Sequence, residues 1–190
     1  MRRDWWGCCE TSRRHAQAWI RADAHAGLKQ LAQAERDFLS AVALFQRGGE
    51  SSRLDDVLSR AVLVVPASSD LRMAYGDYLY QHRKLRDAEK NYRRAIDMGG
   101  DPVRAYTGVG LAQYAGGGFD EAVTSWERAD AGSGEVDSHL AGYLALAHAR
   151  LQHRASCRSY VRRMADAPDV IERFRAHPDW DRVQRLTGEG

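Results

Sequence analysis

The chain has 190 residues, of which 44% are hydrophobic, and this is enough for one well-packed domain. A formal net charge of +2 is nearly balanced, so we expect no general attraction to nucleic acid and no insertion into a membrane. Three cysteines, two of them adjacent at Cys8 and Cys9, do not form a disulfide framework, and no apolar run has the length of a signal peptide or a membrane span. Composition therefore predicts a cytoplasmic protein.

The first 34 residues form an N-terminal segment that precedes the regular part of the chain. Residues 1–11 carry Trp5 and Trp6, which dock either on the protein itself or on a partner. Residues 12–33 are rich in alanine and are predicted to be helical. This helix is either a cap or the eroded second half of an earlier repeat, and in both cases it covers the exposed side of the first unit.

From residue 35 onward, a pattern of two short amphipathic helices joined by a turn recurs every 34 residues. It predicts units at 35–68, 69–102, 103–136 and 137–170. The helices are too short to be stable alone, so neighbouring units must stack. Small and bulky residues alternate where two helices have to interlock. Position 8 of the unit carries Val42, Gly76, Gly110 and Leu144, and position 24 carries Leu58, Tyr92, Trp126 and Tyr160.

The last segment, residues 169–190, is predicted to be a capping helix and tail. It is interrupted at His177-Pro178, and its apolar side is formed by Phe174, Trp180 and Val183. We expect this side to cover the second helix of the fourth unit.

The period and the residue set of residues 35–168 resemble those of tetratricopeptide repeat (TPR) proteins. The resemblance implies an all-α fold: a right-handed superhelix, or α-solenoid, of antiparallel helix pairs with N- and C-terminal capping helices. Residues 71–151, with the motif GVGLAQY at their centre, also resemble the three-repeat class II chaperones of type III secretion systems, which cradle translocator peptides.

We find no signature of catalysis, of a cofactor or of a metal site. HExxH, paired CxxC and nucleophile motifs are missing, and the glycines of residues 116–118 lie between helices without the lysine and serine of a phosphate loop. His153 and Cys157 are four residues apart, but two ligands make a weak metal site. We therefore predict a protein that is not an enzyme.

Arginines recur at every fourth residue at Arg150, Arg154, Arg158 and Arg162. They form either a solvated outer face or a surface for an acidic partner. A turn near His153 would divide the stripe between two helices, so we give it little weight.

The TPR resemblance implies a ligand groove on the concave face, lined by positions 2, 5, 9 and 12 of the first helix of each unit. The residues expected to bind a partner are Arg36, Leu39, Ala43, Met73, Asp77, Tyr80, Arg104, Thr107, Leu111, Tyr114, Ala141, Ala145 and His148. The family's carboxylate clamp requires lysine at position 5 and asparagine at position 9, and no unit has both. The predicted groove instead suits an extended peptide with apolar anchors.

These features predict a non-enzymatic module for protein interaction, an adaptor or chaperone that binds a peptide or helix in the concave groove. One alternative is a structural subunit of a larger assembly, anchored through Trp5 and Trp6. Another is a chaperone like those of type III secretion class II. RNA binding is least favoured.

Overall fold

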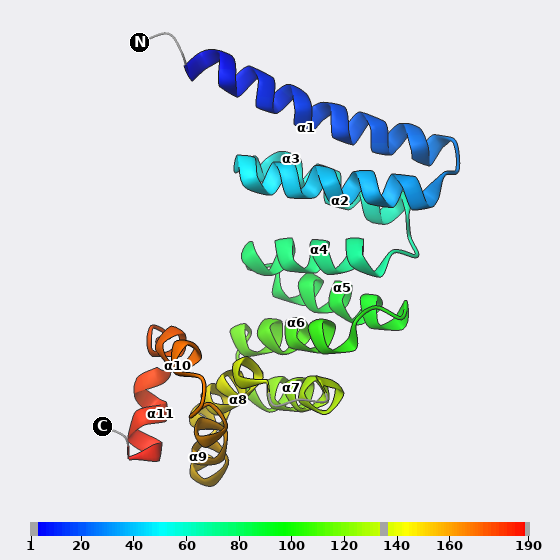
Figure 1. The fold of residues 1–190 in the computed structure, drawn as a ribbon. Coiled ribbons are helices and arrows are strands. Elements are labelled where there is room, and N and C mark those ends of the chain that lie inside the picture. Colours follow the sequence, from blue (N-terminus) through cyan, green and yellow to red (C-terminus); the bar gives the residue numbers. More distant parts are fainter. Residues whose placement is uncertain (1–3, 134–136, 189–190) are drawn as a thin grey trace.

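The computed structural model describes residues 4–133 and 137–188, and within these ranges it contains helices and no strands (Figure 1). The side chains of Trp5 and Trp6 lie outside the described residues. The helices are α1 (Asp4–Gly27), α2 (Leu31–Gly48), α3 (Ser51–Val64), α4 (Ser69–Gln81), α5 (Leu85–Asp97), α6 (Pro102–Ala115), α7 (Phe119–Ser133), α8 (Ser138–Arg150), α9 (Arg154–Arg163), α10 (Pro168–Arg175) and α11 (Trp180–Thr187).

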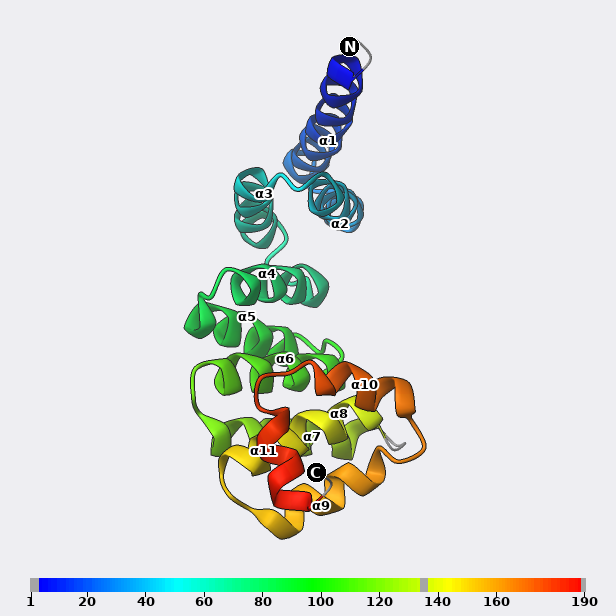
Figure 2. The same ribbon diagram turned by 90° about the vertical axis from the view of Figure 1, so that its left-hand side faces the viewer.

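The helices stack in chain order from α1 at one end of the molecule to α9 at the other (Figures 1 and 2). From α1 to α9 each helix packs on the next, and α4 also contacts α2 and α6. The last two helices leave this order, because α10 and α11 fold back and pack on α8. The solenoid therefore carries a helical pair on its inner side at the C-terminal end.

Glycines let bulky side chains approach the first helices of the middle units, as the alternation of small and large residues predicted. A Cβ atom on Gly76 would lie 2.6 Å from the ring of Tyr92, and one on Gly110 would lie 2.3 Å from Nε1 of Trp126. A Cβ atom on Gly108 would lie 2.7 Å from the same Tyr92 ring. Both rings are almost fully buried, Tyr92 in the core shared by the first three units and Trp126 in a second cluster between α7 and α8.

The N-terminal helix differs from its prediction, because α1 ends at Gly27 and α2 begins at Leu31. Lys29, in the turn between them, has a positive φ of 59°, which breaks the helix. Two side chains of α1 that contact the buried carboxylate of Asp37 then tie the two helices together. The carboxylate of Asp37 on α2 is 2.9 Å from Nε of Arg21 and 2.7 Å from Nδ1 of His25, both on α1.

The fourth unit is displaced by one residue from the gapless period that the sequence predicted. The second helices of the four units, α3, α5, α7 and α9, begin at residues 51, 85, 119 and 154, so the last step is 35 residues instead of 34. Burial follows the same shift: Ala88 and Ala122 correspond to the buried Cys157, not to Ser156. The ends of α4, α6 and α8 at Gln81, Ala115 and Arg150 show the same steps of 34 and 35 residues, so the extra residue lies between the start of α7 and the end of α8.

Candidate functional site

The predicted groove positions on α2 and α4 lie on neighbouring helices, and most of their side chains remain accessible. Arg36 is exposed, while Leu39 and Ala43 are half-buried. Asp77 and Tyr80 on α4 are also half-buried, but Met73 is only 2% exposed and belongs to the core. Met73 therefore supports the groove from below and does not offer its side chain to a ligand.

An ion pair joins α4 to α6 across this surface. Nη2 of Arg104 lies 3.1 Å from Oδ2 of Asp77, and Oδ1 of the same carboxylate accepts a hydrogen bond of 2.9 Å from the buried Tyr92. Burial and the neighbouring Asp77 raise the pKa of Tyr92 above its ordinary value, so its hydroxyl stays protonated and remains a donor. The pair fixes the orientation of Asp77 within the surface.

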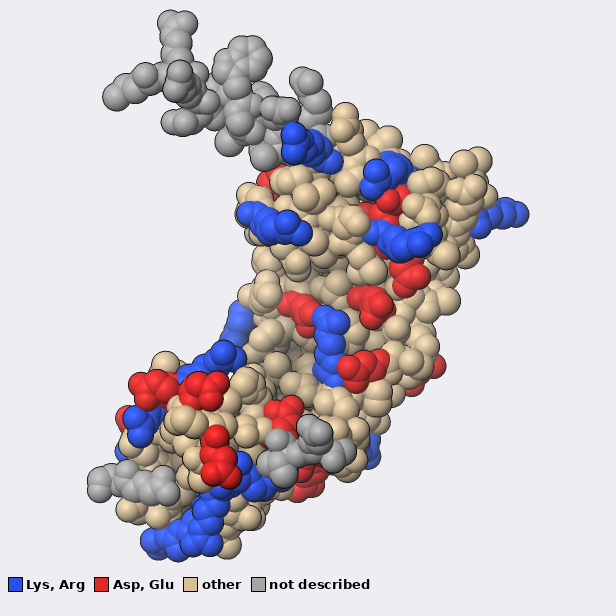
Figure 3. All heavy atoms as spheres, in the orientation of Figure 1, with Lys and Arg blue, Asp and Glu red and all other residues tan. Residues whose placement is uncertain are grey.

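We call the accessible part of this surface the open groove. It lies on α2, α4 and the first part of α6, and the ion pair of Asp77 with Arg104 joins α4 to α6 within it. In Figure 3 the outline of the molecule is hollowed between its upper part and the lower-left part that contains α10 and α11. The open groove consists of Arg36, Leu39, Ala43, Asp77, Tyr80, Arg104 and Thr107.

The predicted groove residues on α8 are covered by the chain itself, whereas Leu111 and Tyr114 on α6 are half-buried. Ala141 and Ala145 are fully buried, and His148 is 7% exposed. With the one-residue displacement of the fourth unit, the groove register on α8 falls instead on His139, Gly142, Leu146 and Ala149. The last three of these are buried too, so the prediction that the groove continues over the fourth unit is not met in this structure.

The cover is the helical pair α10–α11, and its apolar side chains fit directly onto α8. A Cβ on Gly142 would lie 2.2 Å from the Phe174 ring, which also meets Tyr143 edge to face at 5.1 Å between centroids. Trp180 and Val183 are buried in the same cluster. The expected cap on the second helix of the fourth unit is thus only part of the arrangement: α11 does contact α9, but α10 and α11 together also cover the groove face of α8.

A polar contact extends the cover to α6. The hydroxyl of Tyr114 donates a hydrogen bond of 2.6 Å to Oδ2 of Asp179, in the turn between α10 and α11, and Nη1 of Arg150 lies 3.1 Å from Oδ1. The ring of His177 meets Tyr114 at 5.9 Å between centroids. We call these contacts of Asp179 with Tyr114 and Arg150 the polar latch.

The electrostatics of the latch favour a charged Asp179 and a neutral Tyr114. Burial and the hydrogen bond to Asp179 raise the pKa of Tyr114. Burial also tends to raise the pKa of Asp179, but the hydrogen bond from Tyr114 and the charge of Arg150 outweigh it and lower that pKa. Burial lowers the pKa of His177, whose Nδ1 accepts a hydrogen bond from the backbone N–H of Asp179. His177 is therefore neutral here.

Sequence reasoning placed Phe174, Trp180 and Val183 on the apolar side of a cap, but it did not identify Asp179 as a partner of Tyr114. The residues are 65 apart in the chain. The proline at position 178 is the one sequence signal of a change in direction there. Within the described part of the chain, Arg150 ends α8 and Arg154 begins α9, so the arginine stripe is divided as the predicted turn near His153 implied.

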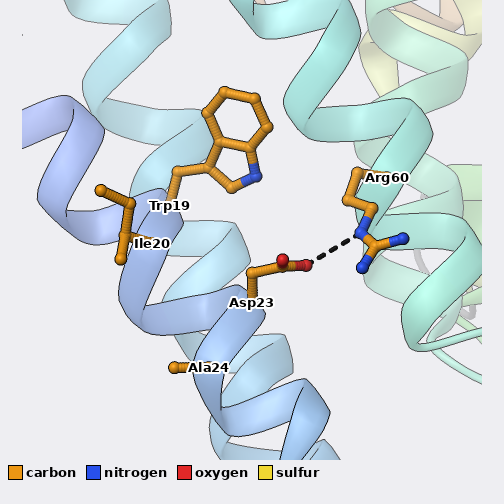
Figure 4. A pocket seen from close by; sticks show the side chains of 5 residues that line it. All are labelled: Trp19, Ile20, Asp23, Ala24 and Arg60. Carbon is orange, nitrogen blue, oxygen red and sulfur yellow. Dashed lines mark hydrogen bonds and ion pairs between the residues drawn. The ribbon is translucent and has the colours of Figure 1, made fainter.

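A second hollow lies near the N-terminal end, between α1 and α3 (Figure 4). It has a volume of about 430 Å³ and is lined by Trp19, Ile20, Asp23, Ala24 and Arg60. An ion pair of 2.8 Å between Asp23 and Arg60 crosses it. Exposed apolar side chains surround the same end of the solenoid: Ile20 is 67%, Leu28 69% and Leu63 74% exposed.

Two other kinds of feature are missing from the described residues. They contain no group of three or more His, Cys, Asp and Glu side chains that could hold a metal ion. They also contain no helix that is both long and apolar enough to span a bilayer.

Comparison with known proteins places the fold. No family model and no curated protein sequence matches the chain. Solved structures do. YrrB, described as a TPR protein with an unusual peptide-binding site, is 12% identical over 80% of this chain and 86% of its own, with a TM-score of 0.61. MamA is 16% identical over 80% of this chain and 95% of its own, with a TM-score of 0.58.

A longer structure gives the same result. In the APC/C hetero-tetramer Cut9-Hcn1, the matched chain is 13% identical, and the match covers 88% of the present chain but 35% of that one, with a TM-score of 0.64. At these identities the likeness concerns the fold. The chain therefore has the tetratricopeptide repeat fold, an all-α right-handed superhelix of antiparallel helix pairs, as its sequence pattern predicted.

Proposed function

We propose that the protein is a non-enzymatic interaction module of the cytoplasm, an adaptor or chaperone that binds a peptide or helix of a partner protein in the open groove. The observation that carries this proposal is that Leu39, Ala43 and Tyr80 stay accessible on adjacent helices. The corresponding surface of α8 is covered by the chain itself. The peptide-binding site of YrrB supports the same use of the fold.

The chemistry of the open groove favours a segment with apolar anchors. Leu39 and Tyr80 supply apolar area, and Asp77 with Arg104 supplies both signs of charge beside it, which suits a polar backbone or a mixed sequence. Acidic and basic residues are interspersed over the face in Figure 3, an arrangement that gives little attraction to a phosphate backbone. A chaperone like those of type III secretion class II is a narrower form of this proposal.

A second candidate is a structural subunit anchored through its N-terminal end. It is favoured by the hollow beside Trp19, which the exposed Ile20 also lines, and by the exposed side chains of Leu28 and Leu63 at the N-terminal end, because exposed apolar area is typical of an interaction surface. The likeness to a chain of the Cut9-Hcn1 assembly agrees with such a role. In this candidate the anchor is the pair Trp5 and Trp6 of the N-terminal segment.

One experiment separates the two candidates with a matched pair of substitutions. Leu39→Glu places a charge in the open groove on α2, and Leu63→Glu places the same charge on α3, which lies behind α2 in Figure 1. Each variant and the wild type are used to capture partners from the native cell, which are then identified by mass spectrometry. We expect a partner that is lost with Leu39→Glu and kept with Leu63→Glu.

The opposite pattern would transfer the function to the N-terminal surface. Retention of every partner by both variants would contradict both candidates. Circular dichroism of the two variants is the control for folding.

A further inference from the structure

The helical pair α10–α11 occupies the same surface on the fourth unit that is open on the first two. In the corrected register, Gly142 on α8 corresponds to Leu39 on α2, and the ring of Phe174 lies directly on it. Asp179 reaches Tyr114, a predicted groove residue of the preceding unit. A cap that merely continued the superhelix would contact the last pair of helices and would not reach back to α6.

Phe174 packs on α8 in the same way as the aromatic rings of the solenoid pack on neighbouring helices, with the ring against a glycine. Tyr92 fits against Gly76 and Gly108, Trp126 against Gly110, and Phe174 against Gly142, each ring taking the space of a missing Cβ. In the first two cases the ring belongs to the solenoid. In the third it comes from a segment that approaches from the groove side.

Two features make this docking reversible in principle. Each of the two helices has only eight residues, so neither is stable apart from the surface on which it packs. The docked state also leaves Nε1 of Trp180 buried without a hydrogen-bond acceptor among the described residues, which is an unfavourable contact. A partner segment that places an aromatic ring there without an unpaired N–H group avoids this unfavourable burial.

We propose that the groove on α6 and α8 is a second peptide-binding site, held closed by α10–α11 acting as a tethered ligand. The partner that it takes is a segment with two aromatic anchors and a carboxylate between them, the chemistry of Phe174, Asp179 and Trp180. This inference rests on the proposed function and adds the class of partner and its regulation. Binding displaces α10–α11, and the groove then continues from α2 to α8.

The test uses the full-length chain and a labelled synthetic peptide of residues 168–188. Asp179→Ala removes the acceptor of the polar latch from the tethered copy but leaves Tyr114 and Arg150 free to hold the peptide. We expect the peptide to bind this variant about ten-fold more tightly than the wild type, because apparent affinity rises with the fraction of open sites. The matched control is Asp181→Ala, which removes an exposed carboxylate two residues away and should bind like the wild type.

A second variant shows whether the peptide uses the same site. In Gly142→Ala the new methyl group takes the space of the Phe174 ring, so the tethered pair is released and the peptide is excluded as well. Hydrogen exchange should show α10 and α11 losing protection in this variant, while the peptide fails to bind. The substitution favours helix formation in α8, so the solenoid is retained.

Unchanged peptide affinity in Asp179→Ala, or binding to Gly142→Ala as tight as to Asp179→Ala, would overturn the proposal. Its failure would not be the failure of the proposed function, which depends on capture of a partner at Leu39 and is measured separately. Conversely, if Leu39→Glu captured the same partners as the wild type, the affinity of the peptide for Asp179→Ala would still decide whether α10–α11 covers a binding site.

Discussion

The two ends of the groove are built from the same type of helix and are used differently. On α2 and α4, Leu39, Ala43 and Tyr80 are partly open to solvent. On α8, the residues in the same place are buried beneath Phe174 and Trp180. The difference shows that a repeat fold does not determine by itself how much of its inner face is available, because a short segment outside the repeats can occupy part of it.

The largest expected effect comes from truncating the main anchor of the covered end. Phe174→Ala should lower the free energy of unfolding of this region by about 3 kcal/mol, since a buried ring is removed and a cavity remains. The effect should be local: amides of α10 and α11 should lose protection from hydrogen exchange while those of α4 and α5 keep it. The matched change at the open end, Leu39→Ala, should cost about 1 kcal/mol or less, because the side chain is only half-buried.

If Phe174→Ala destabilised α4 and α5 as much as α10, the two ends would form one cooperative unit. The open and the covered end of the groove would then differ in the exposure of their surfaces but not in their stability. Urea denaturation monitored by circular dichroism gives the global value for comparison with the local one.

A smaller effect is expected from the polar latch. Tyr114→Phe keeps the ring but removes the donor to Asp179, which still has Arg150, so the loss should be about 1 kcal/mol. Tyr106→Phe on the same helix is the control, because Tyr106 contacts Arg128 through its ring and the substitution keeps that ring. Equal losses in the two variants, measured by hydrogen exchange of α11, would show that the latch contributes nothing.

The smallest effect is a dependence on pH that is confined to the covered end. Burial lowers the pKa of His177 below its ordinary value of 6.5, with Asp179 opposing the shift, so protonation favours the undocked state. The stability of the docked pair should be complete above pH 6.5 and decline as the pH falls below it. Exchange rates of α11 amides, corrected for their intrinsic pH dependence, should show this decline, whereas those of α4 should not.

His177→Gln is the control for the pH prediction, because it removes the titrating group and keeps a side chain that can accept a hydrogen bond. A decline of the same size in this variant would assign the effect to another group. The nearest candidate is His148, whose pKa is also lowered by burial and by His153.

Particular residues show which parts of the fold can be read from the sequence. The contacts of Tyr92 with Gly76 and of Trp126 with Gly110 follow from a period of 34 residues, since ring and glycine recur together. The displaced fourth unit could not be found in this way, because Leu144 and Tyr160 fit a gapless alignment about as well as the correct Ala145 and Val161. Because both members of each neighbouring pair are apolar, a displacement of the repeat by one residue does not change the hydrophobic pattern.

The candidate site was less predictable than the fold. Groove positions on α2 and α4 follow from the repeat register alone. The contact of Asp179 with Tyr114 joins residues 65 apart through a segment without a repeat pattern, and its position depends on the direction the chain takes after α9. The backbone preferences of His177 and Pro178 do not determine the path of the chain after α9. That path depends on the apolar surface of α8, on which Phe174 and Trp180 pack.

The single additional residue between the start of α7 and the end of α8 has a geometric consequence for the inner face of the solenoid. In an α-helix one residue corresponds to a rotation of about 100°, so a change of one position exchanges the side of α8 that faces inward. The inward side carries Gly142 in place of Ala141, and with it a recess the size of a methyl group in which an aromatic ring can rest. The extra residue thus replaces the last part of the groove with a recess at Gly142, into which the Phe174 ring packs.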